Sequence, residues 1–133
     1  MLTRTAEGYT LQSRYYLLSH FRRIAEASDL ELLRVLSGFT PADWDRAVQS
    51  GEFPELSRRL LVAAVGEDQA QRDVFVMSAA LRSDGAYTEL LGEALRLQYE
   101  ADPHIWEEAL SAFSVKEADL LRQLIDPAGE NHP

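Results

Sequence analysis

Apolar residues in this chain recur at three- and four-residue spacings, the pattern of helices that bury one face. The first such stretch runs from about Thr10 to Ala27 and is apolar over so much of its surface that it predicts a central helix. Stretches that alternate apolar and polar residues between turn signals, as half-buried strands do, do not occur in the sequence. The pattern therefore predicts an all-α fold.

Local start and stop signals divide this pattern into about eight short helices. N-cap residues, prolines at first helical positions and terminating glycines place the helix starts near positions 10, 28, 40, 54, 68, 88, 103 and 114. Residues 1–127 are expected to form a single helical domain, because a chain of 133 residues supports one core. The polar residues 128–133 are expected to be a disordered tail.

The sequence also resembles itself at an offset of 74 residues, which aligns 32 positions without a gap inside the possible repeats 10–50 and 84–125. Eight of 32 aligned positions are identical, including Leu36, Ser37 and Phe39 with their counterparts Leu110, Ser111 and Phe113. One interpretation is a duplication, with two pseudo-repeated three-helix units bridged by two helices. The other is that capped helix pairs in all-α proteins share such features without common origin.

The composition indicates in which cellular compartment the protein is expected. The chain has no cysteine, which fits a reducing environment, and no apolar run approaches the roughly 20 residues that span a bilayer. Twelve of its thirteen basic residues are arginine, a bias that we interpret as the codon usage of a GC-rich bacterium. We therefore expect a bacterial, cytoplasmic protein that does not insert into membranes.

Charge is distributed unevenly along the chain. Residues 1–66 hold eight basic and eight acidic side chains, whereas residues 67–133 hold five and fourteen. The whole net charge of −9 therefore falls on the second half. An acidic surface of this kind repels nucleic acid and affects partners and solubility rather than the fold.

The segment Leu32 to Val48, with the sequence LLRVLSGFTPADWDRAV, carries the sharpest motif. A short helix, a turn at Gly38-Phe39 and a second helix capped by Thr40 resemble the helix-turn-helix units of bacterial regulators, including flagellar master regulators of the FlhD/FlhC kind. The resemblance covers about an eighth of the chain. It implies a small helical regulator that binds DNA alone or with a partner subunit.

Electrostatics limit that implication. The helix in the recognition position offers Asp43 and Asp45 against Arg46 alone, whereas base and phosphate contacts favour Arg, Lys, Asn or Gln. The predicted first helix is more basic. The residues that we expect to contact any nucleic acid are Arg14, Arg22, Arg23 and Arg46.

Motifs for catalysis or cofactor binding are not found, so we expect no catalytic residues, no metal ligands and no cofactor. His104 with Glu107 and Glu108 is the only local group with ligand-like spacing. A solvated acidic turn is the more common origin of such a group.

Aromatic residues point instead to protein contacts, because such residues dominate binding interfaces. The expected partner or dimer surface consists of Tyr15, Tyr16, Leu18 and Trp44, and we expect a homodimer through the first helix. The leading hypothesis is a non-enzymatic regulatory or adaptor protein acting through protein–protein contacts. The alternatives are a helix-turn-helix transcriptional regulator and an acidic inhibitor from a mobile element that blocks a nucleic-acid-binding target.

Overall fold

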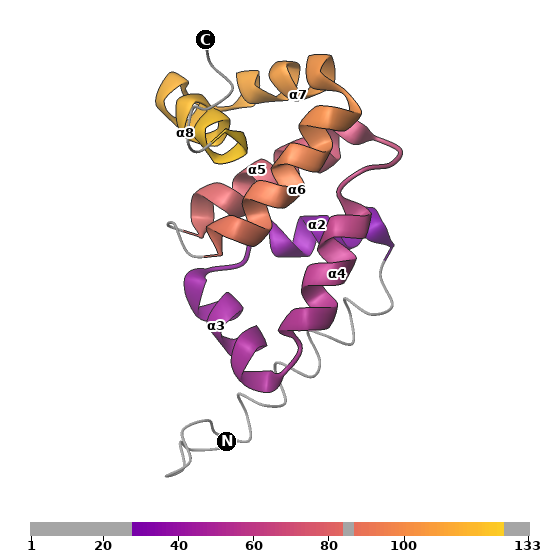
Figure 1. Ribbon diagram of the computed structural model, residues 1–133, viewed down its shortest axis with the longest axis vertical. Helices are drawn as coiled ribbons and strands as arrows, with labels where there is room; N and C mark the ends of the chain where they lie inside the picture. The colour runs from indigo at the N-terminus through magenta and orange to yellow at the C-terminus, as the bar shows by residue number, and fades with distance from the viewer. Residues whose placement is uncertain (1–27, 84–86, 127–133) are drawn as a thin grey trace.

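The computed structural model describes residues 28–83 and 87–126, and these residues are helical without any strand (Figure 1). The predicted helix over 10–27 and the tail 128–133 lie outside the described residues. The all-α prediction is confirmed. The described helices are α2 (Asp29–Leu36), α3 (Pro41–Ser50), α4 (Phe53–Ala63), α5 (Gln69–Arg82), α6 (Thr88–Ala101), α7 (Pro103–Ala109) and α8 (Val115–Ile125), with a 3-10 turn at Leu110–Ala112.

Caps that the sequence predicted begin several of these helices. The Ser28 hydroxyl accepts from the backbone N–H of Glu31, and Asp102 accepts from that of Ile105 at the start of α7. Thr40 and Ser114 each form a complete capping box, the former with Asp43. These bonds satisfy backbone donors that a helix start otherwise leaves unpaired.

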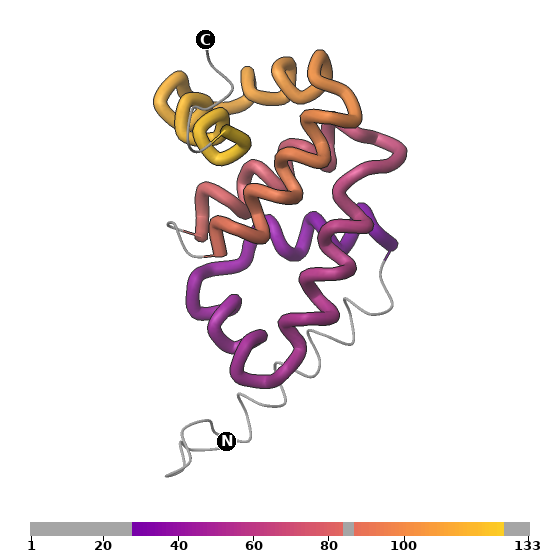
Figure 2. The backbone as a smooth tube through the Cα atoms, in the orientation of Figure 1, coloured from indigo at the N-terminus to yellow at the C-terminus, as the bar shows by residue number. Residues whose placement is uncertain are grey.

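Helix α5 lies at the centre of the bundle, where it packs against α2, α6, α7 and α8 (Figure 2). The tube shows α5 and α6 running side by side, with α7 and α8 together at the C-terminal end. Helix α4 packs against α2, α3 and α6. Within the described residues, no helix is both long enough and apolar enough to cross a membrane.

Two tryptophans occupy separate parts of the core. Trp44 of α3 lies against the rings of Phe39, Phe53 and Tyr87, with centroids 5.0, 6.3 and 5.5 Å away. Trp106 of α7 packs edge-on against Tyr99 at 5.5 Å. Edge-to-face and tilted arrangements of this kind add to the free energy of apolar burial.

A buried polar joint connects α4, α5 and α6. The carbonyl oxygen of Ala64 accepts from Nε2 of both Gln69 and Gln98, each at 2.9 Å. Gln69 Nε2 also donates to Asp73 Oδ1 at 2.7 Å, so the same amide bridges the end of α4 to a carboxylate on α5. Gln98 and Asp73 are completely buried. We call Ala64, Gln69, Asp73 and Gln98 the polar joint.

The polar joint explains a correction to one predicted boundary. Gly66 is the terminating glycine that the sequence offers for the fourth helix, but α4 ends at Ala63. The guanidinium of Arg72 donates to Ala63 O at 2.7 Å and to Glu67 O at 2.6 Å. Gln69 and Gln98 donate to Ala64 O. Side chains from later helices thus satisfy the carbonyls that end α4, so the chain can turn early.

The described part of the internal repeat shares local structure but not packing. Leu36 and Leu110 are both buried, and both units continue into a capping box. Helix α3, however, packs against α4, whereas α8 packs against α5 and α6. Trp44 has Ala118 as its counterpart at the offset of 74, so the aromatic packing of the first unit has no equivalent. The duplication stays a prediction.

We expect Thr40→Ala and Ser114→Ala each to lower the free energy of unfolding by about 1 kcal/mol, because each removes the acceptor of a capping box. Urea unfolding measures the change. Ser111→Ala is the matched control, since its exposed hydroxyl donates only to Glu108 O. Equal effects of all three substitutions would contradict the role of the caps.

Candidate functional site

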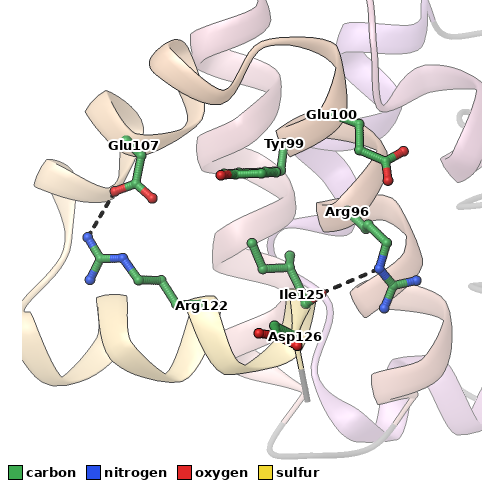
Figure 3. A pocket seen from close by; sticks show the side chains of 7 residues that line it. All are labelled: Arg96, Tyr99, Glu100, Glu107, Arg122, Ile125 and Asp126. Carbon is green, nitrogen blue, oxygen red and sulfur yellow. Dashed lines mark hydrogen bonds and ion pairs between the residues drawn. The ribbon is translucent and has the colours of Figure 1, made fainter. Parts of the chain in front are cut away.

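A cleft of about 410 Å³ opens between α6, α7 and α8 (Figure 3). Arg96 and Glu100 lie at one end, and Glu107 and Arg122 lie at the other. Between these two charged ends are Tyr99 and Ile125. The remaining lining residue is Asp126, which follows α8. The cleft therefore combines an apolar middle with a cation and a carboxylate at each end.

Close approach of α6 and α8 fixes one wall of this cleft. Gly92 is buried in α6, and a Cβ atom at this position would lie 3.1 Å from the carbonyl oxygen of Leu124. Glycine thus lets the end of α8 reach the backbone of α6. One turn further along α6, Arg96 Nε lies 3.4 Å from Ile125 O, a long contact at the last carbonyls of α8.

An ion-pair network closes the opposite end. Arg122 Nη2 donates to Glu107 Oε1 at 3.0 Å, and Nη1 lies 3.4 Å from Asp119 Oδ1. Its hydrogen bond to Glu107 raises the pKa of the Arg122 guanidinium. All three side chains are about half exposed, so the network orients charges at the rim and adds little to stability.

The cleft lies in the most acidic part of the described chain. From Thr88 to Ile125 there are eight carboxylates and three cationic side chains. Such an excess produces a negative potential that favours cationic or mixed-charge ligands over anionic ones. The side chains that line the cleft can bind a ligand through hydrogen bonds, ion pairs and apolar contacts.

Trp44 requires a correction. The sequence prediction placed it on a partner surface, but its side chain is 0% exposed. Phe39, Phe53 and Tyr87 surround the indole, and α3 turns this face towards α4. The sequence pattern of an amphipathic helix cannot distinguish an aromatic residue in the core from one at an interface. In this structure Trp44 belongs to the core.

Arg46 lies in α3, where its guanidinium pairs with Asp43 at 3.1 Å. Asp45, on the same helix, accepts from the hydroxyl of Tyr87 at 2.8 Å. The structure thus pairs the predicted contact residue with one carboxylate of its own helix. The other predicted site residues, Tyr15, Tyr16, Leu18, Arg14, Arg22 and Arg23, lie outside the described residues.

His104 and Glu108 are both largely exposed, with Nε2 and Oε2 3.6 Å apart. Among residues 28–83 and 87–126, no three His or carboxylate side chains gather as metal ligands would.

Sequence reasoning missed the cleft because three helices supply its lining. One signal was available, since Arg96, Tyr99 and Glu100 are three and four residues apart and so share a face of α6. Which other helices that face meets depends on the packing of α7 and α8, and the spacing does not specify it.

Comparison with known proteins adds no relationship: the chain matches no family model, no curated protein and no solved structure.

We expect Trp44→Ala to lower the free energy of unfolding by about 3–5 kcal/mol, because it removes a large side chain from the core. Denaturant unfolding followed by circular dichroism measures this. Val62→Ala is the control, since Val62 is apolar but largely exposed, and its cost should stay within about 0.5 kcal/mol. If both variants lowered the free energy of unfolding by a similarly small amount, Trp44 would be a surface residue and not part of the core.

Proposed function

We propose that this protein is a non-enzymatic regulatory or adaptor protein that acts through protein–protein contacts, with the α6–α7–α8 cleft as its binding site. The observation that carries the proposal is the composition of the cleft, in which Tyr99 and Ile125 lie between two charged ends. Interfaces commonly combine an apolar centre with a polar, hydrogen-bonding rim.

The chemistry of the cleft favours a peptide segment as its ligand. A peptide can place an apolar side chain against Tyr99 and Ile125 while its flanking groups pair with the two ends. Glu100 is exposed and forms no ion pair with the described residues, so its carboxylate is available to a cation on the partner.

The surrounding charge favours a basic partner. Carboxylates outnumber cations across α6, α7 and α8, and a complementary positive surface would be attracted over distances near the Debye length. A basic nucleic-acid-binding protein is one partner of this kind, which connects the proposal to the acidic-inhibitor alternative.

Direct binding of DNA is less well supported. The helix in the recognition position, α3, presents Arg46 already paired with Asp43. Phosphate contacts require cations that are free to replace counterions, and this pairing competes with that role for the only basic residue of α3.

We expect a fluorescently labelled peptide of mixed Arg and Leu residues to bind the protein, and its Glu and Leu counterpart not to bind. Binding should weaken in the double variant Glu100→Gln with Glu107→Gln, which removes one carboxylate from each end of the cleft. Fluorescence anisotropy at physiological salt measures both affinities.

The matched control is Glu89→Gln with Glu93→Gln, which removes the same charge from exposed positions of α6 outside the cleft lining. An equal loss in the two double variants would show that net charge alone attracts the peptide. Tight binding of a mixed-sequence DNA duplex, with no peptide binding, would favour the transcriptional regulator instead.

The predicted homodimer has its own test. Sedimentation equilibrium should give a mass well above the 15.0 kDa of one chain. Replacing Tyr15 and Tyr16 with Ser should then return the protein to the monomer mass, because these aromatic residues form the expected contact surface. A mass of 15.0 kDa at the highest concentrations tested would rule the homodimer out.

A further inference from the structure

Asp73 is a carboxylate in the middle of the bundle, on the central helix α5. Its side chain is 0% exposed, and Oδ1 accepts one hydrogen bond, from Gln69 Nε2 at 2.7 Å. The second oxygen, Oδ2, is buried without a hydrogen-bond partner. An ionised carboxylate can accept several hydrogen bonds, so this environment leaves most of its charge uncompensated.

The adjacent cation does not neutralise it. Arg72 is nearly buried too, but its guanidinium donates to the carbonyls of Ala63 and Glu67. On α6, Gln98 presents a buried Oε1 that also has no partner. A protonated Asp73 carboxyl group is neutral, so its burial costs less than that of the carboxylate.

The other charged groups near α5 either disfavour ionisation of the Asp73 carboxyl group or do not face it. Asp102, between α6 and α7, adds a repulsive negative charge. The charged groups of α2, α7 and α8 are exposed, paired with one another or, for Glu117, bonded to a helix cap. These groups are Asp29, Glu31, Arg34, His104, Glu107, Glu108, Lys116, Glu117, Asp119 and Arg122. On α6 the groups are Glu89, Glu93, Arg96 and Glu100, all exposed.

We propose that Asp73 is a proton-operated switch in the polar joint: uptake of one proton at its carboxyl group strengthens the packing of α4, α5 and α6 in mildly acidic solution. The proposal rests on the burial of Asp73, on the unpartnered Oδ2 and on the engagement of Arg72 with backbone carbonyls. It is independent of the function proposed for the cleft.

The direction of the effect follows from linkage. Burial, opposed by the Gln69 bond and reinforced by Asp102, raises the pKa of the Asp73 carboxyl from 3.8 to about 6. The folded state therefore binds this proton more strongly than the unfolded state does, and stability increases as the pH falls through about 6 towards 4. Below the unfolded pKa both states hold the proton, and the contribution stays constant.

The test is urea unfolding of the wild type and Asp73→Asn at about pH 7.5 and about pH 5. Asparagine keeps the acceptor for Gln69 and carries no charge. At pH 7.5 we expect its folding equilibrium constant to exceed that of the wild type by on the order of 100-fold. At pH 5 this ratio should be about tenfold smaller, because most of the wild-type carboxyl is then protonated.

Asp68→Asn is the matched control. It makes the same chemical change five residues earlier, at an exposed helix start whose backbone Asn also tolerates. The proposal requires the ratio for Asp73→Asn to change with pH by more than the ratio for Asp68→Asn does. The proposal is overturned if Asp73→Asn is less stable than the wild type at pH 7.5, or if its advantage does not change with pH.

A direct titration decides the case if Asp73→Asn does not fold. The side-chain carboxyl carbon of Asp73 in the wild-type protein can be followed by NMR as the pH is lowered. A midpoint near 6 supports the proposal. A midpoint at or below the ordinary value for aspartate would contradict it.

Discussion

The carbonyl oxygen of Ala64 accepts hydrogen bonds from two side chains that belong to two other helices, and the rest of the bundle is arranged around this point. Gln69 reaches it from α5 and Gln98 reaches it from α6, so the end of α4 is tied to both. Because Ala64 and Gln98 are buried, leaving either polar group without its partner would cost several kcal/mol in uncompensated loss of hydration. The joint therefore restricts how α4, α5 and α6 can pack.

The position of the cleft follows from the same constraint. Gln98 ties α6 to the end of α4, and the next residue, Tyr99, lines the cleft between α6, α7 and α8. Trp106 packs against Tyr99 on one side, and Gly92 admits the end of α8 on the other. The binding site that we propose is thus a consequence of packing around α6, with its charges added at the rim.

Local features of the fold could be predicted from the sequence because local interactions determine them. Thr40 and Ser114 form the predicted N-caps, and each belongs to a capping box, with Asp43 and Glu117 respectively, whose bonds involve residues only three apart. The end of α4 was predicted too late, because Arg72 and the glutamines act on its carbonyls from other helices. Hydrophobic spacing does not report such contacts.

Asp73 and Gln98 are two buried polar residues whose role hydrophobic periodicity alone could not explain. Asp73 lies three and four residues before Val76 and Met77, and Gln98 follows Leu95 by three, so both lie on apolar faces. Polar residues on such a face indicate a joint or a switch only when their partners are known. Trp44 illustrates the opposite case, in which a residue typical of interfaces belongs to the core.

We expect the polar joint and α5 to unite the described helices in one cooperative core. Amide hydrogen exchange under native conditions tests it most directly, because it resolves the free energy of opening for each helix. We expect the interior amides of α4, α5 and α6 to exchange last and together, through global unfolding. If α2 to α4 opened as a unit while α5 to α8 stayed protected, the joint would not hold the bundle together and the claim would be wrong.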